Sequence, residues 1–167
     1  MTRKRSAVEW GGLALWLAIT FAAAAIGSLG SRNSAGFYSD LVQPSWAPPS
    51  SVFGPVWTTL YALMAIAAWL VWRERAVNRD NVARSLGFFI AQLLLNTLWS
   101  WLFFAWHEGA LAFWDIIALW ILIVVTLVLF WRVHPLAGLL LLPYLIWVTF
   151  AAVLNFTTWR LNPQVLG

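Results

Sequence analysis

The chain has 167 residues, of which 62% are hydrophobic and 10% are charged, and its formal net charge is +4. A water-soluble globular domain needs more charged surface than this, so the composition excludes that class of protein. The chain also has no cysteine, which excludes disulfides, thiol catalysis and zinc–thiolate or iron–sulfur sites.

Five apolar stretches predict membrane-spanning helices. A helix rises about 1.5 Å per residue and the hydrocarbon core of a bilayer is about 30 Å thick, so roughly twenty apolar residues span it. The stretches cover residues 10–29, 53–72, 86–106, 110–131 and 136–158, and only Asp115 interrupts them with a formal charge. We therefore predict an all-α integral membrane protein, in which residues 1–167 form a single bundle of five transmembrane helices surrounded by membrane lipid.

The first stretch has two interpretations. The basic residues Arg3–Arg5, the apolar run and the small residues Ala22–Ala25 resemble a secretory signal peptide, which would be cleaved. However, the run is longer than a usual signal core, and Trp10 and Trp16 are bulky residues suited to anchoring and packing. We expect the segment to be retained as the first helix.

Residues 30–52 form the only long connection. They include the stiff and aromatic residues Tyr38, Pro44, Trp46, Pro48 and Pro49, which are unusual in a plain linker. We predict that this segment is a lid over a cavity. The alternative is a proline-rich connector that lies on the membrane surface.

Two helices carry inward polar and aromatic stripes. The third stretch places Gln92, Asn96, Trp99 and Phe103 on one face, and the fifth repeats the pattern with Tyr144, Trp147, Ala151, Asn155 and Trp159. Amides that face lipid are costly, so both stripes should point into the bundle. For Gln92 and Asn155, interhelical hydrogen bonding is an equal alternative to ligand binding. Asn96, near mid-span among aromatic residues, suits the orientation of a flat apolar ligand.

The distribution of Lys and Arg predicts the orientation, because these residues are retained on the cytoplasmic side. With the N-terminus inside, the inner segments hold Arg3, Lys4, Arg5, Arg73, Arg75, Arg79, Arg84 and Arg132, and the outer ones hold only Arg32 and Arg160. We therefore expect a bacterial inner-membrane protein with a cytoplasmic N-terminus and an outer C-terminus. In this topology Trp57, Asn96, Trp147, Trp99 and Asn155 converge on an outer-half cavity beneath the long connection. Because the charge is explained by orientation, no nucleic acid partner is expected.

Two further patterns concern assembly and metal binding. Gly87 and Ala91 form a small-xxx-small pair on another face of the third helix, which predicts a homodimer interface, with internal packing as the alternative. His107 and His134 lie at opposite membrane faces, so we expect no metal site.

Five motifs, in order along the chain, resemble the TspO/MBR family of tryptophan-rich sensory proteins, which includes the mitochondrial translocator protein. They read PSWAPP at 44–49, VWTTLY at 56–61, AQLLLNTLW at 91–99, PYLIW at 143–147 and LNFTTWR at 154–160. The resemblance covers nearly the whole chain. Two departures are a Phe37-Tyr38-Ser39-Asp40 sequence where several relatives have Trp-Tyr-Asp, and Phe156, which lacks the hydroxyl of the family's proposed cholesterol pattern.

The resemblance implies five helices around a pocket for porphyrins such as protoporphyrin IX, and in some members for sterols or isoquinoline carboxamides. It implies ligand contacts from Trp57, Asn96 and Trp147, with a lining of Tyr38, Trp46, Tyr61, Trp99 and Tyr144. It implies no obligatory cofactor, and we expect no catalytic residue. A light-dependent porphyrin-degrading enzyme and a porphyrin transporter are the alternatives to a regulatory or sensory binding protein.

Overall fold

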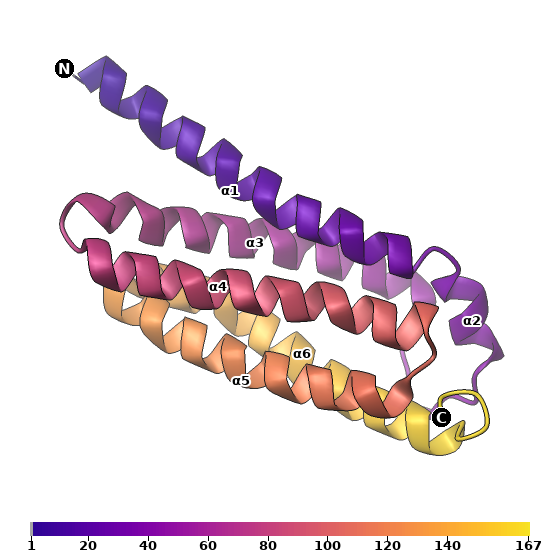
Figure 1. Cartoon of the computed structure of the whole chain (residues 1–167). Coiled ribbons are helices and arrows are strands. Elements are labelled where there is room, and N and C mark those ends of the chain that lie inside the picture. The colour runs from indigo at the N-terminus through magenta and orange to yellow at the C-terminus, as the bar shows by residue number, and fades with distance from the viewer. Residues whose placement is uncertain (1) are drawn as a thin grey trace.

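A computed structural model describes residues 2–167, and from Glu9 onward it describes the side chains as well. Five long helices run alongside one another as a bundle (Figure 1). They are α1 (Thr2–Gly30), α3 (Phe53–Arg73), α4 (Arg79–Ser100), α5 (Gly109–Val133) and α6 (Pro135–Leu161). Each contains a stretch that is long and apolar enough to cross a membrane, so the predicted class, an all-α five-helix membrane bundle, is confirmed.

Shorter helices complete the chain. The 3-10 helices η1 (Ser50–Val52) and η2 (Glu74–Ala76) precede α3 and follow it, and α2 (Ser34–Asp40) lies in the connection between α1 and α3. A π-helical segment, η3 (Trp101–Ala105), continues α4. Residues 31–52, called the first connection below, were predicted as a long loop that forms a lid, and they contain two short helices, α2 and η1.

The observed helix bounds differ from the apolar stretches mainly at α4. This helix begins at Arg79, whereas the apolar stretch begins at residue 86. Its first turns carry the charged residues Arg79, Asp80 and Arg84, so hydropathy does not predict them to lie in a bilayer. A helix can contain such residues where it extends into water. α6 likewise extends to Leu161, past the expected end at 158.

The helices form a ring in the order α1, α3, α6, α5, α4, in which each helix packs against its two neighbours. Figure 1 shows the N-terminus at one end of this bundle, and α2 and the C-terminus together at the other. We call the second end the connection end. The alternation of direction follows from the short links between α3 and α4, α4 and α5, and α5 and α6.

The half of the bundle away from the connection end is closely packed. There α3 contributes a series of fully buried small and medium side chains, including Ala65, Ala68 and Val71, and the rings of Phe89 and Phe130 stack 5.6 Å apart. Small residues allow neighbouring helices to approach closely, which is how membrane helices gain van der Waals contact. The connection-end half is less densely filled, because a cavity replaces the core there.

The outer surface of the bundle is apolar. Leu94, Trp114 and Ile146 are each at least 66% exposed, as expected for side chains that face lipid. Gly87 is also exposed, and a Cβ added to it would meet no atom within 4 Å. With Arg84, Phe88, Ala91 and Leu122 it lines a shallow groove on α4 and α5. Internal packing therefore does not account for Gly87, and the predicted dimer contact stays a prediction.

Close packing at the α5–α6 turn gives a first prediction. A Cβ at Gly138 would lie 2.9 Å from Trp131 Cβ and 3.0 Å from Trp131 Cα, so Gly138→Ala must push the two helices apart. We expect it to lower the free energy of unfolding by about 1 to 3 kcal/mol, which thermal unfolding in detergent measures. Gly11→Ala is the control, because a Cβ there would meet nothing within 4 Å. Equal melting temperatures for the two variants would contradict this packing.

Candidate functional site

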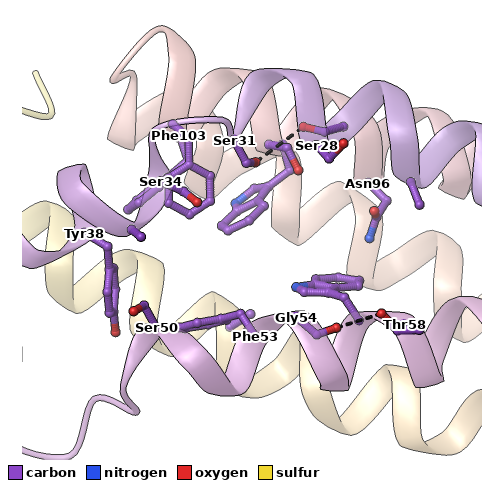
Figure 2. A pocket seen from close by; sticks show the side chains of 18 of the residues that line it. Ser28, Ser31, Ser34, Tyr38, Ser50, Phe53, Gly54, Thr58, Asn96 and Phe103 are labelled. Atoms are coloured by element: carbon purple, nitrogen blue, oxygen red, sulfur yellow. Dashed lines mark hydrogen bonds between the residues drawn. The ribbon is translucent and has the colours of Figure 1, made fainter.

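A cavity of about 730 Å³ occupies the connection-end half of the bundle. This volume lies within the range of about 300 to 1,000 Å³ typical of pockets that enclose a small organic ligand. Its walls come from α1, α3, α4 with η3, and α6, and α2 with η1 lies at its end. Figure 2 shows side chains from these elements directed toward one another across the open space.

The floor of the cavity is a hydrogen-bonded network around Asn96, which is 4% exposed. The Tyr61 hydroxyl donates to Asn96 Oδ1 at 2.5 Å, and Asn96 Nδ2 donates to the Tyr144 hydroxyl at 2.9 Å. These bonds join α3, α4 and α6 at one depth. Asn96 also lines the cavity. Its amide links the three helices, and a ligand could use only the hydrogen-bonding capacity that these two bonds leave.

Aromatic rings form the walls. Trp57 packs on Tyr61 with the ring centroids 5.6 Å apart, and Trp147 lies edge-on to Phe53 at 5.9 Å. Trp147 Nε1 is buried and has no hydrogen-bond partner among the described residues. A buried indole N–H normally finds an acceptor. An acceptor atom on a bound molecule would satisfy it.

The second polar stripe is partly structural. Asn155 is 2% exposed, and its Oδ1 accepts a hydrogen bond from Trp99 Nε1 at 2.9 Å, while its Nδ2 donates to the Gly109 carbonyl at 3.3 Å. Asn155 thus makes the interhelical bonds that were one of its two interpretations, and it also lines the cavity. Gln92 lies among the buried core residues outside the cavity, where its Nε2 contacts Met64 Sδ at 3.9 Å.

The π-helical segment shapes the wall on α4. The backbone N–H of Trp106 donates to the Trp101 carbonyl at 2.9 Å, a bond across five residues that widens the turn. Such wide turns often occur at functional sites. Phe103 lies within the wide turn and Trp99 lies just before it; their rings stack 5.5 Å apart, and both residues line the cavity.

The first connection covers the end of the cavity. Tyr38 on α2 is 6% exposed, lines the cavity and donates from its hydroxyl to the Pro48 carbonyl at 3.3 Å. The side-chain amide of Gln43 donates to the Tyr38 carbonyl. Burial raises the pKa of the Tyr38 phenol, so this side chain stays neutral at physiological pH. These contacts give the connection the position expected of a lid.

A second set of contacts fastens the connection to the far end of α6. The side chain of Asn162 accepts from the Val42 backbone N–H and donates to the Val42 carbonyl, both at 2.8 Å. Leu41, 5% exposed, packs in a small cluster with Leu102 and Leu166. Phe37 stacks on His107 at 4.1 Å. The connection is therefore held on the side of α4, α5 and α6.

On the opposite side, the cavity is bordered by exposed residues of two helices. Phe21, Ala25 and Ser28 of α1 and Gly54 and Thr58 of α3 line the cavity and are exposed. Figure 2 shows Ser28 on the upper helix and Gly54 and Thr58 on the lower one, on opposite sides of the open space. The cavity thus opens between the connection-end halves of α1 and α3.

Most of the sequence-predicted site residues meet in this cavity, and two do not. Its lining includes Tyr38, Trp57, Tyr61, Asn96, Trp99 and Trp147. Trp46 lies outside it, 45% exposed, with its ring against Phe150 on α6 at 5.8 Å. Tyr144 lies behind Asn96, 1% exposed, and supports the floor without lining the space. The prediction that these two residues line the pocket is therefore wrong. Trp46 packs on the outside of α6, and Tyr144 is covered by the Asn96 amide to which it is bonded.

Sequence reasoning missed the contribution of α1 and the helix starts. Ser28, Ser31 and Ser34 recur every three residues and line the cavity, as do Ser50 and Ser51. Of the described residues, none that lines the cavity carries a formal charge. The serine spacing was a usable signal, but helix α1 has no central amide or tyrosine that would have directed attention to it.

The hydrogen bonds of Asn162 give a second prediction. Asn162→Ala removes both bonds to Val42, so the first connection should open more often and the Val42 amide should exchange roughly tenfold faster, equivalent to about 1.4 kcal/mol. Hydrogen exchange followed by mass spectrometry on the peptide that contains Val42 measures this. Asn81→Ala is the control, since Asn81 pairs with Asn78 at the other end of the bundle. An unchanged exchange rate in Asn162→Ala would contradict this role.

The chain is similar in sequence to known proteins over most of its length. Residues 15–160 match the model of the TspO/MBR family. The chain is 42% identical over 156 residues to the tryptophan-rich protein TspO of Chlorobaculum tepidum, covering 90% of this chain and 96% of that protein. It is 41% identical over 152 residues to protein CrtK of Rhodobacter capsulatus, covering 90% and 94%. It is 39% identical over 126 residues to the human translocator protein, covering 75% of each.

Proposed function

The chain belongs to the TspO/MBR family, and from this premise we propose that it is a regulatory or sensory membrane protein that binds a flat tetrapyrrole such as protoporphyrin IX. The observation that carries the proposal is the aromatic cavity above Asn96. A flat apolar molecule there would stack against indole and phenol rings and remove apolar surface from contact with water or headgroups. Sterol-like lipids and isoquinoline carboxamides are alternative ligands of the same shape class.

Three properties of the cavity support a flat ligand over a compact or highly charged one. Trp57, Trp99 and Trp147 stand on three different helices around one space. The buried N–H of Trp147 gives one directional donor. The lining that the structure describes has no formal charge, so a charged group held in the closed interior of the cavity would lose its hydration without a compensating partner.

Binding by the two indoles gives a third prediction. Trp57→Phe and Trp147→Phe keep a ring but remove the N–H donor, so each should weaken protoporphyrin IX binding by about three- to tenfold, or about 0.7 to 1.4 kcal/mol. Quenching of tryptophan fluorescence during a titration in detergent measures the affinity. Trp131→Phe is the matched control, since Trp131 is 45% exposed and lies outside the cavity. Asn96→Ala should weaken binding and lower thermal stability, because it leaves two tyrosine hydroxyls unpaired.

The proposal fails if wild-type protein shows no saturable quenching, or if all three cavity variants bind as the control does. Illumination of the same samples in air separates binding from light-driven degradation. If the protein only binds the ligand, the Soret band should bleach at the same rate with protein as in detergent without protein. Faster bleaching would favour the enzyme, in which the photo-excited ligand supplies the chemistry beside oxidisable indoles.

We also propose the orientation and the assembly of the bundle. Five basic residues, Arg73, Arg75, Arg79, Arg84 and Arg132, lie toward the end of the bundle where α1 begins, which supports a cytoplasmic N-terminus and a location in a bacterial inner membrane. The remaining basic side chains of this argument, at residues 3–5, lie outside the described ones. The exposed face around Gly87 and Ala91 supports contact with a second copy.

A cysteine-free chain makes both proposals accessible to labelling, which gives a fourth prediction. In intact cells, a membrane-impermeant maleimide should modify a cysteine introduced at Ser45 in the first connection but not one introduced at Val77 between α3 and α4. Both positions are exposed, so accessibility is matched.

An oxidant should crosslink the Gly87→Cys variant as a dimer. The reverse labelling pattern would contradict the orientation, and absence of crosslinking at Gly87, with crosslinking at Ile146→Cys on α6, would contradict the interface.

A further inference from the structure

A row of hydroxyl groups lines the connection end of the cavity. Ser31 lies in the turn after α1, Ser34 is the first residue of α2, and Ser50 and Ser51 belong to η1. Figure 2 shows Ser31 and Ser34 on one side of the open space and Ser50 on the other, near Tyr38. Since α2 and η1 are in contact, these hydroxyls belong to one end of the same cavity.

Three of these serines have no evident role in holding the fold. Serine near a helix start usually caps it by accepting a backbone N–H bond. Here the N-cap positions are Asn33 for α2 and Pro49 for η1, and neither helix has a side-chain cap. Among the described residues, Ser28, Ser31 and Ser39 donate to nearby carbonyls, whereas the hydroxyls of Ser34, Ser50 and Ser51 make no such bond. They are free to bind a ligand.

The opposite end of the cavity is poorly suited to a polar ligand group. The amide of Asn96 is bonded to two tyrosines. An ionised carboxylate placed there would be buried with no cation beside it, at a cost of several kcal/mol. At the serine end, Ser50 and Ser51 are exposed, so a carboxylate keeps part of its hydration. Arg32, exposed and between Ser31 and Ser34 in sequence, adds positive potential there.

We propose that Ser34, Ser50 and Ser51 form a subsite for the carboxylates of a flat amphiphilic ligand. The inference rests on the proposed binding function and adds an orientation to it. The apolar edge of the ligand lies toward Asn96, and its carboxylates lie at the connection end beneath Tyr38. The serines thereby determine specificity: they favour a ligand with acidic groups on one edge over the same ring system with those groups masked.

Protoporphyrin IX and its dimethyl ester test this, because they share the ring and differ only at the carboxylates. Titrations of wild type and of the triple variant S34A/S50A/S51A are made in one detergent. The triple variant should bind the diacid about tenfold more weakly and the diester within about twofold of wild type, since hydrogen bonds to a charged acceptor are the stronger ones. For each ligand, the ratio of the variant's affinity to that of wild type cancels the partitioning of that ligand into detergent micelles.

The control S39A/S45A removes two hydroxyls of the same connection that do not line the cavity, and it should leave both affinities unchanged. S34A alone and S50A/S51A repeat the comparison with smaller changes if the triple variant does not fold. A diacid-to-diester ratio equal to that of wild type in these variants overturns the subsite while leaving the binding function intact. Failure of both porphyrins to bind wild type overturns the binding function, and the subsite with it.

Discussion

The amide of Asn96 joins three helices at the depth where the bundle changes from a packed core to a cavity. Within a bilayer there is no water to satisfy a buried amide, so its partners must come from the protein. Here the partners are the hydroxyls of Tyr61 on α3 and Tyr144 on α6. Because both tyrosines must face α4, residues about one turn away on the same helices, Trp57 and Trp147, are also directed inward. The position of the cavity walls thus follows from one hydrogen-bonded bridge.

The polar groups of the cavity are divided between its two ends, and this division has chemical consequences. The floor contains the amide of Asn96 and the phenols of Tyr61 and Tyr144, which are bonded to one another, while the connection end contains free hydroxyls close to the bundle surface. Aromatic rings fill the wall between them. Such an arrangement binds a molecule that is flat and apolar along most of its length and polar at one edge. The connection keeps this end covered through Asn162 and Tyr38, on the side away from the opening between α1 and α3.

The sequence was sufficient for the features that depend on local periodicity. Hydropathy located the five helices, and four-and-three spacing located the inward face that carries Asn96 and Trp99. It was insufficient where a contact joins distant parts of the chain. Asn162 binds the backbone of Val42, 120 residues away, and no local pattern predicts such a pair. Trp46 was misplaced for the same reason, because the side on which its ring packs depends on α6. The polar first turns of α4 were missed because hydropathy predicts only the part of a helix that lies within the bilayer, and α4 begins before that part.

The proposed function requires that a flat ligand lie in the cavity between Trp57 and Trp147. Crystals of the protein with zinc protoporphyrin IX test it directly, because the anomalous scattering of zinc marks the centre of the ring system. We expect one strong anomalous peak inside the cavity, between Asn96 and Tyr38. A peak only on the lipid-facing surface, for example in the groove beside Gly87, with the cavity free of ligand density, would contradict it.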